Sequence, residues 1–174
     1  MSIALSLVNL ARTGWMLRGV PVHLAETVAE HSFLTAYVCL ELASTLPSVD
    51  VGKLVLYSLV HDVSEAFTGD IVKSVSKVLG ESKKKIEVEL VNELVGNEVL
   101  KKAFMEFTAQ NSYEARLAKL CNYIATHIMG LLYKKMGYSV EDILESTWRD
   151  IEELSKNLGV ENQAKEILKA LPFR

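Results

Sequence analysis

Residue types that bind metal ions occur in two separate segments of the sequence. His31 lies in the first segment, and His61 and Asp62 stand side by side in the second. Two imidazoles and a carboxylate can hold a divalent cation and leave positions open for water and substrate. Glu65 and Asp70 follow closely enough to act on a water at such a site. The pattern therefore predicts a metal site that supports hydrolysis.

The spacing of these residues indicates how helices would bring them together. Adjacent residues on a helix point ~100° apart, so His61 and Asp62 can straddle a cation while His31 approaches from a neighbouring helix. Glu65 comes one helical turn after Asp62, which makes it the predicted proton carrier. Asp70 has a second interpretation, because it follows a glycine and is equally suited to cap a short helix.

Burial strengthens the metal interpretation. A single histidine in an apolar helix is usually a hydrogen-bonded core residue, but both motifs together would bury two imidazoles and a carboxylate, which is costly without mutual pairing or a cation. The remaining histidines are expected to be structural, with His23 in a surface loop and His127 in the core. Cys39 and Cys121 lie within apolar helical patterns and are predicted to be reduced core thiols.

Composition limits the classes of function. The chain has 174 residues, of which 49% are hydrophobic, and we expect a single domain over residues 1–174. A net charge of -3 from interspersed acids and bases argues against general binding of nucleic acid or of an anionic membrane. No apolar run approaches a membrane span, and the first residues lack the features of a signal peptide. These observations predict a soluble, cytoplasmic protein whose partner is a small molecule.

Apolar residues recur at helical intervals along almost the whole chain, so an all-α, single-domain helical bundle is predicted. Residues 12–25 interrupt the pattern between the first and the second predicted helix. Asp50 is placed to cap the third helix. That helix is apolar on nearly every side, so we expect it to be central, to carry His61 and Asp62 and to end near Gly69. The other helices are predicted over residues 3–11, 26–46, 81–95, 98–109 and 113–136, with a last helix opened by a capping box at 139–142.

For two helices in the second half of the chain, the sequence predicts which side faces the solvent or the core. In the helix over 81–95, the lysines at 83–85 have acidic neighbours one turn away and are expected to form a solvated face. The helix over 113–136 is expected to contribute a core stripe of Leu117, Cys121, Ile124, Ile128 and Leu132.

Three blocks of sequence carry a resemblance to a known family. They are Arg12–Arg18, Glu26–Ser32 and His61–Ile71. With these blocks in this order, the chain resembles the HD-domain phosphohydrolases, and specifically the small branch that contains the 5′-deoxynucleotidases and their eukaryotic HD-domain-containing relatives. The resemblance covers most of the chain and implies the helical bundle of the HD-domain type.

The resemblance also implies roles for the predicted metal site. A divalent cation such as Mn²⁺, Co²⁺ or Mg²⁺ would be held by His31, His61 and Asp62. Glu65 would have a catalytic role, and Asp70 would contact the substrate or a water.

For the substrate, the resemblance implies a nucleoside monophosphate. Arg12 would contact its phosphate, and the planar fork of a guanidinium suits that group because it can donate two parallel hydrogen bonds. Trp15 would lie near the sugar, and Arg18 would assist or cover the surface. Relatives are commonly homodimers, so a homodimer is implied as well.

One position departs from the family pattern. The fourth metal ligand of the family is an aspartate on the long later helix, three positions after a lysine, and this chain has Asn122 after Lys119. No acidic residue lies between Glu114 and Glu141, so Asn122 must serve as the ligand or nothing on that helix does. An amide oxygen can bind a hard cation but adds no negative charge, so we expect weaker metal binding. His127 is a poor replacement because it points ~140° away around the helix.

Two functions of different classes remain open. In the first, the protein is a metal-dependent phosphomonoesterase acting on nucleoside 5′-monophosphates, in which the metal activates water, Arg12 holds phosphate and Glu65 moves the proton. In the second, the missing aspartate marks a non-catalytic or nucleotide-binding relative whose dimer surface is functional. Retention of Glu65 and Asp70 favours the first. Hydrolysis of nucleoside triphosphates or signalling nucleotides fits this short chain less well.

Overall fold

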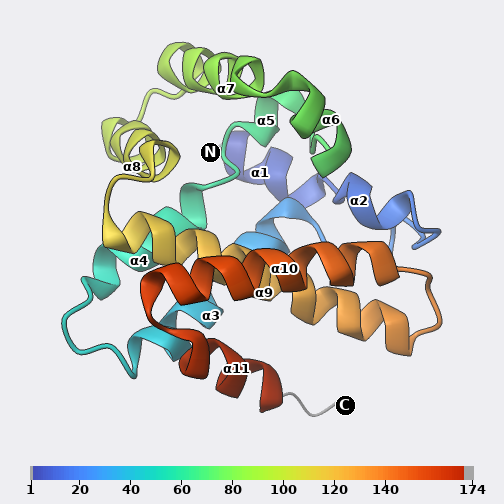
Figure 1. Cartoon of the computed structure of the whole chain (residues 1–174). Helices are drawn as coiled ribbons and strands as arrows, with labels where there is room; N and C mark the ends of the chain where they lie inside the picture. The colour runs from blue at the N-terminus through green and yellow to red at the C-terminus, as the bar shows by residue number, and fades with distance from the viewer. Residues whose placement is uncertain (1, 171–174) are drawn as a thin grey trace.

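Helices joined by turns make up residues 2–170, the part of the chain that the computed structural model describes. Within this part there is no strand, and the one β-type contact is an isolated antiparallel bridge between Ala11 and Thr27. The predicted all-α class is therefore confirmed (Figure 1). The helices of residues 2–170 are α1 (Ser2–Asn9), α2 (Thr13–Met16), α3 (Val28–Ala43), α4 (Val51–Val60), α5 (Glu65–Thr68), α6 (Lys73–Leu79), α7 (Glu81–Leu94), α8 (Glu98–Ala109), α9 (Tyr113–Lys135), α10 (Glu141–Leu158) and α11 (Glu161–Lys169).

The long helix α9 forms the centre of the bundle. Helices α3, α4 and α10 all pack against it, and α10 runs beside it for much of its length (Figure 1). The predicted stripe on α9 is buried except at its end, where Leu132 is half-buried. There Tyr133 takes the inward position and packs against Trp15, with ring centroids 5.0 Å apart. Helix α9 therefore joins the core to the segment that contains α2.

Helix α3 begins at a capping box that the prediction did not include. The Thr27 hydroxyl accepts a hydrogen bond from the Glu30 backbone at 3.2 Å, and the Glu30 carboxylate accepts one from the Thr27 backbone at 2.7 Å. The helix consequently starts at Val28 rather than at Glu26. His31 then lies in the first part of α3 and is fully buried.

Helix α4 is capped as predicted, but it is buried on one face only, because Leu59 on the other face is 49% exposed. The Asp50 carboxylate accepts a hydrogen bond from the Lys53 backbone at 3.0 Å. Leu54, Tyr57 and Val60 are all at most 3% exposed. An apolar helix with such burial points its C-terminal end at the interior of the bundle.

The prediction that this helix continues past His61 is wrong. It ends at Val60, and the chain turns through residues 61–64 before α5 begins at Glu65. The backbone N–H groups of Val63 and Glu65 bond to carbonyls three residues earlier, each at 3.0 Å, which is the pattern of tight turns. The candidate ligands at 61 and 62 therefore project from a turn.

The chain after α5 also differs from the prediction. Gly69 ends α5 with a φ of 73°, as expected for a helix stop. Asp70 does not cap the following helix, because α6 begins after Val72 without a side-chain cap. The Asp70 carboxylate instead accepts a hydrogen bond from the backbone N–H of Thr13, the first residue of α2. Asp70 thus connects the chain after α5 to the segment that carries Arg12.

The predicted capping box at the start of α10 is also wrong. The residue before the helix is Val140, which is buried, and no side chain caps this end. The Asp142 carboxylate forms an ion pair with Arg18 instead of completing a capping box.

The remaining histidines and the cysteines lie where the sequence predicted. His23 is exposed, and His127 is buried with a hydrogen bond to Thr147 at 2.9 Å. Cys39 and Cys121 are both buried in the core. Among residues 2–170, no helix is both long enough and apolar enough to cross a membrane.

Candidate metal centre

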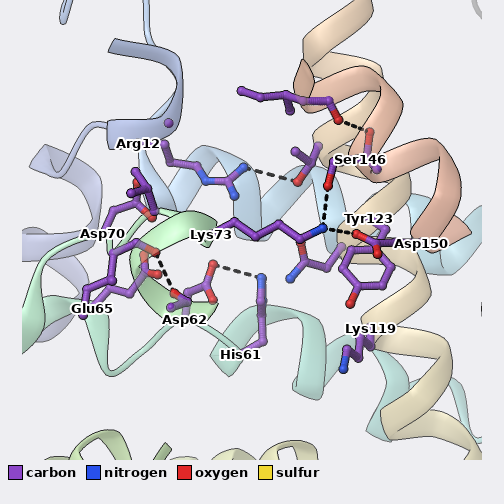
Figure 2. Close-up of a pocket in the computed structure, with 18 of the residues that line it drawn as sticks. Arg12, His61, Asp62, Glu65, Asp70, Lys73, Lys119, Tyr123, Ser146 and Asp150 are labelled. Atoms are coloured by element: carbon purple, nitrogen blue, oxygen red, sulfur yellow. Dashed lines mark hydrogen bonds and ion pairs between the residues drawn. The ribbon is translucent and has the colours of Figure 1, made fainter. Parts of the chain in front are cut away.

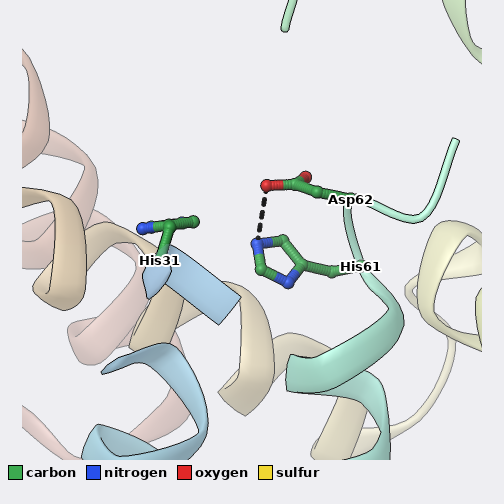
Figure 3. Close-up of side chains that lie close together, drawn as sticks. All are labelled: His31, His61 and Asp62. Carbon is green, nitrogen blue, oxygen red and sulfur yellow. Dashed lines mark ion pairs between the residues drawn. The ribbon is translucent and has the colours of Figure 1, made fainter. Parts of the chain in front are cut away.

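Three side chains from separate parts of the chain converge at the end of α4. His31 comes from α3, and His61 and Asp62 come from the turn after α4 (Figure 3). Each offers one ligand atom, and these atoms all lie within 4.8 Å of one another. The two imidazole rings meet edge to face with centroids 5.3 Å apart. The geometry brings together the three residues that the sequence predicted, although it does so through a turn rather than a continuous helix.

The environment of His61 fits a cation. Its Nδ1 lies 2.7 Å from the Ser58 carbonyl oxygen, which can only accept, so Nδ1 carries the hydrogen. When the ring carries only this hydrogen, Nε2 is an acceptor, and it lies 3.0 Å from a carboxylate oxygen of Asp62. Nε2 is buried, and among the described residues it has no hydrogen-bond donor. Two acceptor atoms at this distance repel each other unless a proton lies between them or a metal ion binds both.

Asn122 reaches the same cluster from α9. Its Oδ1 lies 3.2 Å from His31 Nε2, and Arg12 Nη1 lies 3.0 Å from His31 Nδ1. Burial, followed by the charges of Arg12 and His61, lowers the pKa of His31 well below its usual value. His31 is therefore neutral at pH 7, which is the form that binds metals. The structure thus places the one departure from the family pattern beside a candidate ligand.

The carboxylate of Asp62 stays ionised in this setting. Burial on its own would raise its pKa, but its neighbours His61, His31 and Arg12 together hold the pKa well below its usual range. Two imidazoles, a carboxylate and an amide oxygen are a suitable donor set for a divalent cation such as Mn²⁺, Co²⁺ or Mg²⁺.

A cavity of about 710 Å³ opens beside the cluster (Figure 2). Its walls come from the segment of α2, the turn after α4, the chain from α5 to α6, and helices α6, α7, α8, α9 and α10. Of the nine predicted site residues, eight line it, whereas His31 is fully buried behind the wall. The eight are Arg12, Trp15, Arg18, His61, Asp62, Glu65, Asp70 and Asn122.

Glu65 is a buried acid at the floor of this cavity. Its residue is 7% exposed, and within residues 2–170 its Oε2 has no hydrogen-bond partner. Burial, and then the charges of Asp62 and Asp70, raise the pKa of Glu65 well above its usual value. A carboxyl group in this condition keeps its proton to a higher pH than a free one does, which makes Glu65 a candidate acid–base group.

The three residues predicted to bind substrate differ in what they contact. Arg12 Nη1 donates to Glu26 at 2.8 Å, in addition to its contact with His31. Trp15 is 2% exposed, and its indole Nε1 also donates to Glu26 at 2.8 Å. Arg18 lies at the rim, where it pairs with Asp142. Arg12 and Trp15 are thus held firmly in the wall, whereas Arg18 is held by an exposed ion pair.

Sequence reasoning missed several polar residues of the cavity. Lys83 was expected on a solvated face, but it lines the cavity and pairs with Glu87 at 2.6 Å. Lys73 extends across the cavity to Ser146 and Asp150 on α10 (Figure 2). No local pattern marks these residues, because their position depends on how α6 and α7 fold over the site. Glu26 could have been noticed, since it is an acid in the block that also carries His31.

Comparison with known proteins identifies the family of the chain. The sequence pattern of the HD domain family matches residues 6–161, which is most of the chain. The chain therefore belongs to the HD domain family.

Two curated relatives have a similar sequence. The 5'-deoxynucleotidase HDDC2 of Dictyostelium discoideum is 30% identical over 147 residues, which cover 77% of this chain and 75% of that protein. The 5'-deoxynucleotidase hdd1 of Schizosaccharomyces pombe is 25% identical over 149 residues, which cover 79% of this chain and 72% of that protein.

Two solved structures have a similar fold. The PH0347 protein from Pyrococcus horikoshii OT3 gives a TM-score of 0.79 at 26% identity, over 97% of this chain and 94% of that one. A conserved hypothetical protein from Pyrococcus furiosus gives a TM-score of 0.79 at 27% identity, over 96% of this chain and 94% of that one. The helical fold of this chain is thus shared across nearly the full length of both.

Proposed function

We propose that this protein is a metal-dependent phosphohydrolase that releases phosphate from nucleoside or deoxynucleoside 5′-monophosphates. The observation that carries the proposal is the convergence of the ligand atoms of His31, His61 and Asp62 to within 4.8 Å of one another, beside a buried carboxylate oxygen of Glu65 that has no hydrogen-bond partner among residues 2–170. The names of the two curated relatives support the nucleotide substrate.

The size and polarity of the cavity suit such a substrate. A volume of about 710 Å³ lies within the usual range for sites that take a ligand of drug-like size. The phosphate end would lie near Arg12, and the indole of Trp15 would form the wall beside the sugar. Among the described residues, Arg12 makes its side-chain hydrogen bonds through Nη1. Its other nitrogens are therefore suited to donate to phosphate oxygens.

The metal would be held by His31, His61, Asp62 and Asn122. When bound, a divalent cation polarises a phosphoryl oxygen and lowers the pKa of a water. This is the chemistry that a phosphate ester needs at neutral pH.

The chain's own residues would manage the charge and the proton. In hydrolysis a water oxygen forms a bond to phosphorus, the bond from phosphorus to the 5′ oxygen breaks, and one proton must pass from the water to the leaving oxygen. The raised pKa of Glu65 suits it to accept the first proton and to deliver one to the leaving oxygen. Arg12 would hold the phosphate still while this occurs.

A second function is favoured by one specific observation. Asn122 occupies the ligand position on α9, with its amide oxygen 3.2 Å from His31 Nε2, and it contributes no negative charge. A cation held too weakly would leave a nucleotide-binding protein without catalysis. The homodimer that the resemblance implies stays a prediction under both functions.

A phosphate-release screen separates the two functions. Chelator-treated protein is given Mg²⁺, Mn²⁺ or Co²⁺ separately and tested on nucleoside and deoxynucleoside monophosphates. The hydrolase proposal predicts phosphate release with at least one cation and none with chelator. Binding of nucleotide without release under every condition would favour the non-catalytic function and contradict the proposal.

A further inference from the structure

Glu26 connects three side chains of the candidate site. Its Oε1 accepts hydrogen bonds from Arg12 Nη1 and from Trp15 Nε1, each at 2.8 Å. The same oxygen lies 3.7 Å from Nδ1 of His31. Glu26 is 5% exposed and stands behind the wall of the cavity. One buried carboxylate oxygen is therefore shared by the residues proposed for the phosphate, the sugar and the metal.

The backbone of Glu26 is fixed on both sides. Its N–H donates to the Tyr133 hydroxyl at 2.8 Å, and that hydroxyl donates to the Leu24 carbonyl at 2.9 Å. Its carbonyl accepts from the Arg12 N–H at 2.9 Å, beside the bridge between Ala11 and Thr27. These contacts tie the start of α3 both to the Arg12 segment and to α9. The carboxylate therefore has a defined position relative to all three elements.

The local structure does not require an acidic residue at position 26. The capping box of α3 uses Thr27 and Glu30, so Glu26 is not needed to begin the helix. A buried carboxylate is costly, and a neutral side chain could accept the Trp15 hydrogen bond equally well. The charge is matched by Arg12, whose guanidinium would otherwise lack its nearest counter-charge. The Glu26 carboxylate thus contacts side chains of the candidate site rather than side chains of the hydrophobic core.

We propose that Glu26 is a positioning residue that fixes the Arg12 guanidinium and the Trp15 indole relative to the metal cluster. This inference rests on the proposed function, because it takes Arg12 as the group that binds phosphate. Glu26 itself touches neither substrate nor reacting atoms. It acts by holding Arg12 at one nitrogen, so that the remaining nitrogens meet the phosphate at a constant place.

The test is a double-mutant cycle between Glu26→Gln and Arg12→Met. Glutamine keeps the shape and an acceptor oxygen but removes the charge. We expect Glu26→Gln alone to lower kcat and kcat/KM together by roughly 10 to 100-fold. This is the usual effect of changing a residue that orients a group in direct contact with a metal or substrate. In the Arg12→Met background the same change should alter kcat/KM by less than about 3-fold, because the group that Glu26 positions is gone.

Two controls separate positioning from folding. Glu106→Gln removes a charge that accepts a hydrogen bond from Tyr57 at 2.6 Å, away from the lining of the cavity, and should leave kcat unchanged. In Glu26→Gln, the indole N–H resonance of Trp15 should move while that of Trp148 stays in place. An unchanged Trp148 signal shows that the bundle is folded.

The outcomes are distinct. Equal losses from Glu26→Gln in both backgrounds, or no loss in either, would overturn the proposal. If Arg12→Met does not fold, Arg12→Lys replaces it in the cycle. If the wild-type protein releases no phosphate, the proposed function fails, and the cycle is repeated on the Kd of deoxyadenosine 5′-monophosphate measured by calorimetry. Coupling in Kd would still support positioning by Glu26, and additivity in Kd would still overturn it.

Discussion

The inner and outer sides of the cavity are built from similar residue types in opposite environments. On the inner side, the side chains of His31 and Glu26 are at most 4% exposed. On the outer rim, Arg18 pairs with Asp142 and Lys73 with Asp150, and the exposed fractions of Asp142 and Lys73 are 60% and 49%. The inner contacts lie among low-dielectric core residues, whereas water screens the rim pairs. The same kind of ion pair should therefore be essential on one side and replaceable on the other.

This comparison also explains what each side can do. The inner side fixes donor atoms and shifts pKa values, because burial makes each charge depend on its neighbours. The rim pairs join α10 to the segments of α2 and α6 across the cavity, and they can open and re-form at little cost. Figure 2 shows the pair of Lys73 with Asp150. Chemistry is therefore expected to depend on the inner side and substrate entry on the rim.

The largest effect is expected from Glu65→Gln on the inner side. Removing the proposed proton carrier should lower kcat by roughly 10² to 10⁴-fold, the usual contribution of general acid–base catalysis. Metal binding should persist, because Glu65 is not among the three clustered ligands. Phosphate release measured beside metal calorimetry checks both statements. Activity that survives this change would show that another group moves the proton.

The same variant should change stability in a pH-dependent way. Because the pKa of Glu65 is raised above its ordinary 4.5, the folded protein holds a proton that the unfolded chain releases as the pH rises. The free energy of unfolding of the metal-free wild-type protein should therefore fall as the pH rises above 4.5, and that of Glu65→Gln should not show this fall. We expect the variant to be more stable by roughly 1 to 3 kcal/mol at neutral pH and to lose this advantage in acid. Denaturant unfolding with chelator at several pH values measures the difference.

The next effect is expected from Asn122→Asp, which restores the ligand type of the family. An added carboxylate beside His31 should tighten Mn²⁺ or Co²⁺ binding by roughly 10 to 100-fold. Without metal it should destabilise the protein, because a further negative charge then lies near Asp62. The exposed Asn92→Asp serves as the matched control and should change neither quantity. Unchanged metal affinity in Asn122→Asp would show that position 122 is not a ligand.

The smallest effect is expected from Asp150→Asn on the rim. The exposed pair with Lys73 should contribute less than about 1 kcal/mol to folding, and kcat should change by no more than about 3-fold. KM should become less dependent on salt, because a screened charge is removed from the cavity mouth. A loss of kcat as large as that from Glu65→Gln would contradict the distinction between the two sides.

The sequence predicts the inner side better than the rim. His31, His61 and Asp62 can be found from residue type and spacing, and helix α9 from its apolar stripe. The turn after Val60 was not predicted, because the apolar pattern gives no sign that the helix stops there. Tertiary contacts decide this point, which is also why Asp70 bonds to the start of α2 rather than capping α6.

Residues whose role depends on distant partners could not be predicted. Glu26 matters because the fold brings Arg12 and Trp15 into contact with it. A local sequence pattern carries no information about such contacts between separate segments. Lys83 belongs to a run that looks solvated, and only the packing of α7 over the cavity turns it inward. Motifs therefore identify the groups that do chemistry, and the fold identifies the groups that hold them.

Metal stoichiometry tests the central claim most directly. Chelator-treated protein is titrated with Mn²⁺ or Co²⁺ by calorimetry, with His61→Gln as the test variant and the exposed His23→Gln as its control. The account predicts one ion per chain in the wild type and in His23→Gln, and no binding at this site in His61→Gln. Absence of a stoichiometric ion in the wild type, or equal binding by His61→Gln, would contradict it.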